Sequence, residues 1–357
     1  MLSPNVNEVS ETIAGAFSQY NTVKSFGYGV MNTVVSPLSP DPEWLTPLRA
    51  RMDLLKRSCQ SWQSESPEIL VGFLSPFVGY APLMEAIADT MKKPNPRTSD
   101  LIGLLKAMDE SLSAHRTQTK AAETQFTRHI KEITLAEKDL DQSLQVGWEA
   151  LAHEEQEMLR IAKAITTLQD RVDRLQDNLT SAEISSGKSY FQTSATIAYT
   201  LVTTAGEEIP YLSIVAEVYT IGKMAYDLIV TDQQIDEAID EIVKLRVEAS
   251  EAAQAAAMAK AIIQMINAFD KRVAGVSDHL PALDQMWEAE AAKVQAVINA
   301  LESGADPSTL LDLVTLGAAA ASWRELATLA QLCITFPIKR GKPVNISTDQ
   351  SVVQTSA

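Results

Sequence analysis

The sequence predicts an all-α protein: an elongated helical bundle with two very long antiparallel helices and a hairpin at their far end. Ten of the fifteen prolines lie before position 97, and the stretches 97–209 and 211–280 contain none, so both lack the residue that most reliably breaks helices. Both stretches carry apolar residues at alternating steps of three and four, the heptad pattern of helices packed along their length. Hydrophobic residues make up 46% of the chain and aromatic residues only 6%, a mixture that suits helix packing better than a sheet core.

The first long helix is expected from about 98 to 186, with Thr98, Ser99 or Asp100 as its N-cap. At 1.5 Å per residue it would be about 130 Å long, which predicts a rod rather than a compact domain. Its heptad seam comprises Leu101, Leu105, Met108, Leu112, His115, Thr119, Ala122, Phe126, Ile130, Ile133, Glu137, Leu140, Leu144, Trp148, Leu151, Glu155, Met158, Ala162, Ile165, Leu168, Val172, Leu175 and Leu179.

The second long helix carries a matching seam between Ile235 and Val273, so we expect an antiparallel pair. Shorter helices are expected at 6–35, 43–63, 67–92, 278–303 and 307–334. The predicted domains are therefore a helical tail bundle (1–186 and 232–335), a head hairpin (187–231) and a loose polar C-terminal tail (336–357).

The head hairpin differs from the rest of the chain because Ser189–Gly206 contains no charged residue. A turn at Gly206–Pro210 leads into a second arm. At helical spacing each arm has an apolar and a polar face, so a ring of such hairpins would turn one face to lipid and the other to a water-filled lumen. The membrane-facing set is Phe191, Ala195, Ala198, Leu201, Val202, Leu212, Val215, Tyr219, Gly222, Tyr226 and Ile229; the pore-lining set is Thr193, Thr196, Thr200, Thr203, Glu207, Glu208, Glu217 and Asp227.

Two alternatives concern this segment. Its β-branched residues also fit a β-hairpin or tongue, although we favour helices. The segment could equally be a helical hairpin that only caps a coiled coil. Ser185, Ser186 and Gly187 precede it and are candidate hinge positions.

Composition and motifs argue against other classes of function. The net charge of −16 offers no basic face for nucleic acid. The four histidines do not cluster and no phosphate-binding loop, nucleophile elbow or carboxylate pair occurs, so we predict no catalytic, cofactor-binding or metal-binding residues. Cys59 and Cys333 both fall in the expected short-helix bundle, where they form either a disulfide or two buried free thiols. The N-terminal residues do not form a recognisable signal peptide.

The layout of long helices, a short-helix bundle at one end and the Ser189–Val230 hairpin at the other resembles the α-helical pore-forming toxins of the cytolysin A type. It is most like haemolysin BL, the non-haemolytic enterotoxin and their tripartite Gram-negative counterparts. The resemblance is one of layout over roughly 6–335, without a short shared motif.

The resemblance implies a mechanism and a set of partners. A secreted, soluble form would swing its head out and assemble as a homo- or hetero-oligomer with partner toxin components in the lipid of a target cell membrane, causing haemolysis. The threonine stripe and acidic residues of this head make it look like the lumen-lining component. The competing hypothesis is a cytoplasmic coiled-coil scaffold or adaptor with no membrane activity.

Overall fold

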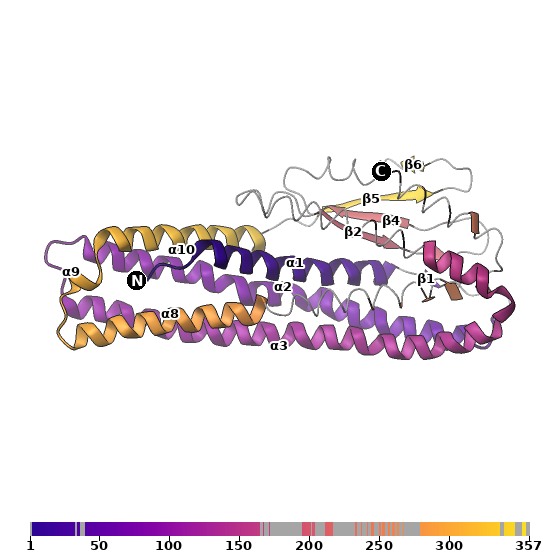
Figure 1. The fold of residues 1–357 in the computed structure, drawn as a ribbon, viewed down its shortest axis with the longest axis horizontal. Helices are drawn as coiled ribbons and strands as arrows, with labels where there is room; N and C mark the ends of the chain where they lie inside the picture. Colours follow the sequence, from indigo (N-terminus) through magenta and orange to yellow (C-terminus); the bar gives the residue numbers. More distant parts are fainter. Residues whose placement is uncertain are drawn as a thin grey trace. The chain divides into compact units, whose positions relative to one another are not determined.

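We analysed a computed structural model of the 357-residue chain (Figure 1). Residues 1–20, 66–127 and 275–336 form one compact unit, and residues 21–65, 128–274 and 337–357 form a second. This division crosses the long helices and does not coincide with the limits at 186 and 232 expected from the sequence. The structure describes residues 2–32, 34–35, 40–164, 195–200, 202–203, 211–216, 279–335, 339–346 and 352–354, with isolated positions between 167 and 267.

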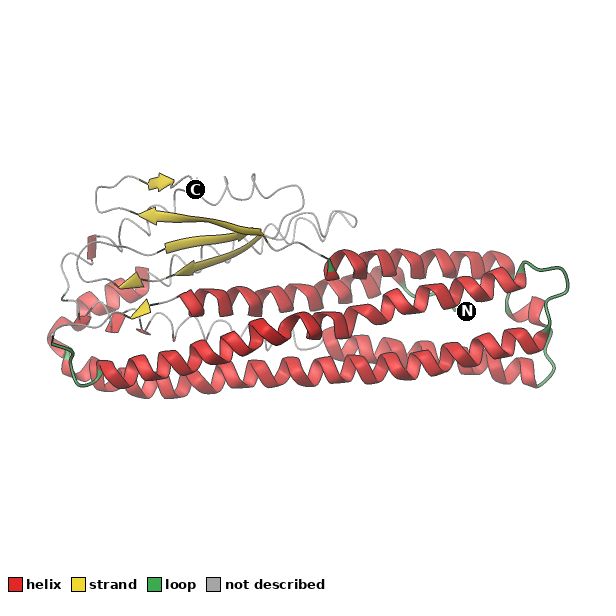
Figure 2. Cartoon of the chain, turned by 180° about the vertical axis from the view of Figure 1, so that it is seen from behind, coloured by secondary structure: helices red, strands yellow, loops and turns green. Residues whose placement is uncertain are grey.

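Helices dominate the described residues and confirm the all-α bundle (Figure 2). The expected helices at 6–35, 278–303 and 307–334 are found within a few residues of their predicted limits. Asp312 interrupts the last of them and caps its second part by accepting hydrogen bonds from the backbone of Val314 and Thr315. The helices are α1 (Val6–Asn32), α2 (Leu45–Met91), α3 (Thr98–Ala150), α8 (His279–Glu302), α9 (Pro307–Leu310) and α10 (Leu313–Ile334).

Helix α2 corrects the prediction of two separate helices at 43–63 and 67–92. It runs without interruption through Pro67, Pro76 and Pro82. Each proline removes a backbone hydrogen bond, at a cost of about 3 kcal/mol in a helix interior. Burial offsets that cost, because the apolar face between the prolines, including Phe73 and Phe77, is almost fully buried. The Phe73–Leu83 segment is therefore largely core.

Helix α3 confirms the first heptad seam as far as Leu144 but is much shorter than expected. Its seam residues Leu101, Leu105 and Leu140 are fully buried. The helix ends at Ala150, the 3₁₀ turn η1 (Ala152–Glu154) follows, and helix resumes at Glu155. The predicted uninterrupted helix over 98–186 is thus wrong. A close contact precedes the break: a Cβ on Gly147 would lie 2.5 Å from the Trp44 ring, so only glycine lets α3 approach this tryptophan so closely.

The core of the first unit contains an aromatic cluster contributed by α2, α8 and α10. Tyr80 of α2 contacts Trp323 of α10 with ring centroids 4.4 Å apart, and Trp287 of α8 stacks on Trp323 at 5.8 Å. Trp323 Nε1 donates a hydrogen bond of 3.1 Å to the carbonyl of Leu2. Ion pairs between Arg116 of α3 and Asp284 of α8 add a polar rim. This end of the bundle is therefore closed by packing between elements that are distant in sequence.

The second unit contains a four-stranded antiparallel sheet with strand order β2-β4-β5-β6. The strands are β2 (Ala195–Thr200), β4 (Tyr211–Ala216), β5 (Lys339–Ile346) and β6 (Val352–Gln354); a separate short pair joins β1 (Val34–Val35) to β3 (Val202–Thr203). The favoured helical interpretation of the head is therefore wrong for these strands, and the β-hairpin alternative holds. The tail expected to be loose instead supplies β5 and β6.

Candidate functional site: the strand hairpin and the polar contacts of the bundle

The candidate site is the hairpin formed by β2 and β4. Six residue pairs join the strands, from Ala195 opposite Ala216 to Thr200 opposite Tyr211, and neither strand contains a charged residue. Of the predicted head residues, the structure brings together Ala195, Thr196, Ala198, Thr200, Leu212 and Val215 in this hairpin, and places Val202 and Thr203 in β3. The following lie outside the described residues: Phe191, Leu201, Tyr219, Gly222, Tyr226, Ile229, Thr193, Glu207, Glu208, Glu217, Asp227 and the hinge positions Ser185, Ser186 and Gly187.

The strand geometry changes which residues of the hairpin share a face. Successive residues of a strand alternate between its two sides, so Thr196, Ala198 and Thr200 occupy one side by position. At the helical period of 3.6 residues, Ala198 would instead lie on the opposite face from the two threonines. The lipid-facing and pore-lining sets therefore do not form two faces of this hairpin in its present conformation.

The C-terminal segment contributes cations that the sequence analysis overlooked. Lys339 lies opposite Ala216 and Arg340 opposite Val215, and the pairing resumes with Pro343 opposite Ser213. Gly341 and Lys342 of β5 thus lie opposite the single residue Ile214 of β4, which is a β-bulge. Gly341 and Pro343, which has no backbone N–H, favour such an irregularity. The sequence does contain a sign of this cationic strand: three cations occur within the four residues 339–342, in a chain whose net charge is −16.

A polar contact joins the η1 turn to Ser250, which lies in the stretch predicted as the second long helix. The Glu154 carboxylate accepts hydrogen bonds from the backbone N–H of Ser250 at 2.9 Å and from its hydroxyl at 2.8 Å. The Ser250 hydroxyl in turn accepts a hydrogen bond from the Ala253 N–H. Ser250 is outside the helix and acts as an N-cap, so the predicted seam over 235–273 is interrupted there. Both segments that flank the hairpin in sequence therefore have a break at this contact.

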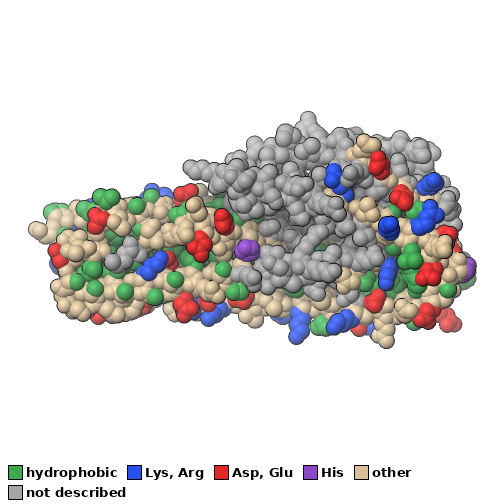
Figure 3. Space-filling view, viewed as in Figure 1, with side chains coloured by type: hydrophobic (Ala, Val, Ile, Leu, Met, Phe, Trp, Pro, Cys, Tyr) green, Lys and Arg blue, Asp and Glu red, His purple; other side chains and the backbone are tan. Residues whose placement is uncertain are grey.

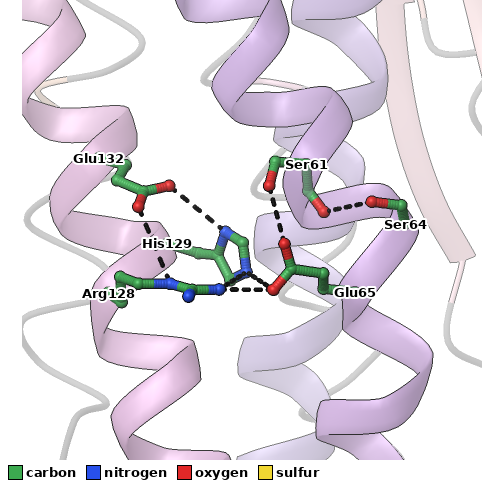
Figure 4. Close-up of polar contacts among 6 residues, drawn as sticks. All are labelled: Ser61, Ser64, Glu65, Arg128, His129 and Glu132. Atoms are coloured by element: carbon green, nitrogen blue, oxygen red, sulfur yellow. Dashed lines mark hydrogen bonds and ion pairs between the residues drawn. The ribbon is translucent and has the colours of Figure 1, made fainter.

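A second polar cluster connects α2 and α3 within the same unit (Figure 4). His129 is fully buried on α3, and its Nε2 lies 3.2 Å from Glu65 Oε2. Arg128 donates to the same carboxylate. A hydrogen bond from Ser61, together with those from His129 and Arg128, lowers the pKa of Glu65. The cluster therefore links α2 to α3 through polar contacts. Among the described residues no group of three potential ligands converges to hold a metal ion.

The two cysteines are free, buried thiols. The disulfide between Cys59 and Cys333 is therefore not formed, and the free-thiol alternative describes the structure. Burial raises the pKa of Cys59 to about 12 and that of Cys333 well above its usual value. Both thiols are held protonated at neutral pH and are poor nucleophiles.

His115 gives the bundle a predicted pH dependence. It packs beside Trp287, with ring centroids 5.2 Å apart, and burial lowers its pKa to about 4. In the unfolded chain the same group titrates near 6.5. Between these values the unfolded state binds the proton more tightly, so the free energy of unfolding should fall as the pH is lowered from about 6.5 to about 4.

We expect His115→Gln to lose less stability than the unmodified protein on acidification. Urea unfolding followed by circular dichroism at pH 7 and pH 5 measures both changes. Equal losses in the two proteins would show that His115 does not contribute.

In the face drawn in Figure 3, acidic and basic side chains of the described residues are interspersed. Within the described residues, α2 is the one helix long and apolar enough to cross a membrane, by length and composition alone. Half of that apolar window is buried inside the structure.

The described long helices and the uncharged hairpin fit the layout of the helical toxins that the sequence resembles. Comparison with solved structures supports this class of protein. Over 99% of its length the chain is 31% identical to motility associated killing factor B from Vibrio cholerae, whose whole chain is covered with a TM-score of 0.84. A second solved structure of that protein, described as the cytotoxin MakB, gives 31% identity and a TM-score of 0.83, with both chains covered completely. The chain therefore belongs to the family of motility associated killing factor B, a cytotoxin.

More distant structures share the fold. The HblL1 toxin component of Bacillus cereus is 13% identical with a TM-score of 0.68, the alignment covering 92% of this chain and 97% of that one. SmhA, from a tripartite α-pore-forming toxin of Serratia marcescens, is 14% identical with a TM-score of 0.67 and 94% of each chain covered. No protein-family model and no curated protein sequence matches the chain. At identities of 13% and 14%, the likeness to HblL1 and SmhA is one of fold.

Proposed function

We propose that this protein is one component of a multi-protein α-pore-forming cytolysin. A secreted, soluble form joins partner components on a target cell membrane, and together they build an oligomeric transmembrane pore. The uncharged hairpin of β2 and β4 carries the proposal, because it is the segment of the described sheet whose composition suits lipid. The tripartite toxin to which SmhA belongs supports the multi-component form.

The dimensions of the hairpin imply that it changes conformation before it spans a bilayer. Six residues at about 3.3 Å each extend about 20 Å, whereas the hydrocarbon core is about 30 Å thick. An open sheet edge would also leave backbone groups without partners in lipid. As helices, the arms 189–206 and 211–230 would extend about 27 and 30 Å at 1.5 Å per residue. We therefore propose that the strands refold into two helices as the pore forms.

In the helical form the faces expected from the sequence apply. Thr196 and Thr200 would lie on the lumen side with the other threonines of their stripe, and Ala198 and Leu201 would meet lipid. The acidic residues Glu217 and Asp227 of the second arm are costly to bury singly. Insertion therefore requires neighbouring protomers or partner proteins to enclose a water-filled lumen, which is the role of the lumen-lining component.

The test is dye release from liposomes and lysis of erythrocytes, with the purified protein alone and with the proteins encoded by neighbouring genes. Release that requires those neighbours is the expected result. Replacing Ala198 and Leu201 with aspartate should reduce lysis to background, because each charge must enter hydrocarbon.

The matched control is Ala318→Asp with Leu332→Asp, which adds the same charges on the exposed side of α10. This control should lyse at the rate of the unmodified protein. Undiminished lysis by the head variant would remove the hairpin from the mechanism, and no release with any folded partner would favour the scaffold.

A further inference from the structure

The cations of the four-stranded sheet are concentrated at one place. Strands β2, β4 and β6 contain no charged residue, and β5 contains Lys339, Arg340 and Lys342. The chain as a whole has a net charge of −16, so a local excess of three positive charges runs against its composition. These charges adjoin the hairpin that the proposed function assigns to the membrane.

The strand register places this cationic run at the base of the hairpin. Lys339 lies opposite Ala216, and Ala216 is in turn opposite Ala195, at the end of the hairpin away from its connecting turn. The turn end is marked by the pair Thr200 and Tyr211. The half of the hairpin nearest the turn thus has no cation beside it, and the half nearest the base, at Val215 and Ala216, lies beside the cationic end of β5.

That order matches the layers of a membrane surface. A hairpin that approaches a bilayer turn first leaves its base at the level of the lipid headgroups, where lysine and arginine are stable and phosphates are available as partners. Salt screens charges beyond about 10 Å, so the attraction depends on the charges near β5, which are the three cations and Glu217, the residue after Ala216. The local cations, rather than the net charge, then decide which lipid the head meets.

We propose that Lys339, Arg340 and Lys342 form a binding site for the headgroups of anionic phospholipids at the base of the head hairpin. The inference rests on the proposed function and deepens it by naming the lipid class that the head recognises. Each cation near an anionic surface contributes about a fivefold gain in partitioning, so the three together correspond to about 100-fold.

The experiment measures co-sedimentation of the full-length protein with vesicles of phosphatidylcholine alone and of phosphatidylcholine mixed with phosphatidylserine. The test variant is K339Q/R340Q/K342Q. The matched control is K92Q/K93Q/R97Q, which removes three exposed cations from the α2–α3 connection and changes the net charge equally. A third variant, K339R/K342R, keeps the charges and reveals whether substitution in β5 by itself disturbs the sheet.

We expect the unmodified protein to prefer the anionic vesicles, and the test variant to bind them about 100-fold more weakly. The control and the arginine variant should bind as the unmodified protein does. Equal binding by the test variant and the control, or no preference of the unmodified protein for phosphatidylserine, would overturn the inference. Dye release with partner components separates the two proposals: if release persists when lipid preference is absent, only the headgroup site is refuted.

Discussion

Replacing Ile197 and Ile214 with cysteine and oxidising the pair is expected to abolish lysis, and reduction should restore it. The two residues lie directly opposite each other in β2 and β4. Opposed residues of antiparallel strands have Cα atoms about 4.5–5.5 Å apart, which falls within the range that a disulfide bridges. A covalent bond between the arms holds the strands in register and prevents each from winding into a separate helix. The measurement is erythrocyte lysis with partner components, with and without reductant.

The native thiols should not form disulfides with the engineered cysteines. Cys59 and Cys333 are buried, and their raised pKa values keep them from competing for the engineered pair. The single variants Ile197→Cys and Ile214→Cys are the controls and should lyse in both conditions. If the oxidised double variant, with its disulfide verified by mass spectrometry, lyses at the unmodified rate, the strands do not refold and the proposed conversion is incorrect.

The hairpin shows where sequence reasoning succeeded and where it failed. The absence of charge in 189–206 distinguishes the segment that contains β2 whatever its conformation, because composition does not depend on conformation. The conformation itself was predicted wrongly, since Thr196 and Thr200 share a face both at a spacing of four in a helix and at an even spacing in a strand. The β-branched residues favoured strands. The strand conformation also depends on the pairing of β4 with β5. No local sequence pattern identifies a pairing partner more than 120 positions away.

The helix ends also differ in how far they can be predicted from local sequence. Local rules located α1, α8 and α10, whose ends are set by caps and nearby residues. They failed at α2, where burial outweighs three prolines, and at the end of α3, where the heptad pattern continues past Leu151 without a breaker. The contacts of Gly147 with Trp44 and of Glu154 with Ser250 join residues about 100 positions apart, so they cannot be read from the seam.

Replacing Trp323 with alanine is expected to destabilise the protein by about 4 kcal/mol, the usual cost of emptying a large aromatic site in a core. The side chain is fully buried, its ring contacts Tyr80 and Trp287, and its Nε1 donates to the carbonyl of Leu2. Urea unfolding followed by circular dichroism gives the free energy of unfolding. Val314→Ala in the same helix is the control, because Val314 is 81% exposed, and it should change stability by less than about 0.5 kcal/mol.

Comparing phenylalanine variants of the two tryptophans separates packing from hydrogen bonding. Trp287 is as deeply buried as Trp323, but within the described residues its Nε1 has no hydrogen-bond partner. Trp287→Phe removes an unpaired donor, whereas Trp323→Phe leaves the Leu2 carbonyl without its donor. Both leave voids of similar size, so Trp323→Phe should cost about 1 kcal/mol more. Equal costs would mean that the hydrogen bond holding the Leu2 segment in place adds nothing to stability, and that ring packing alone closes this end of the bundle.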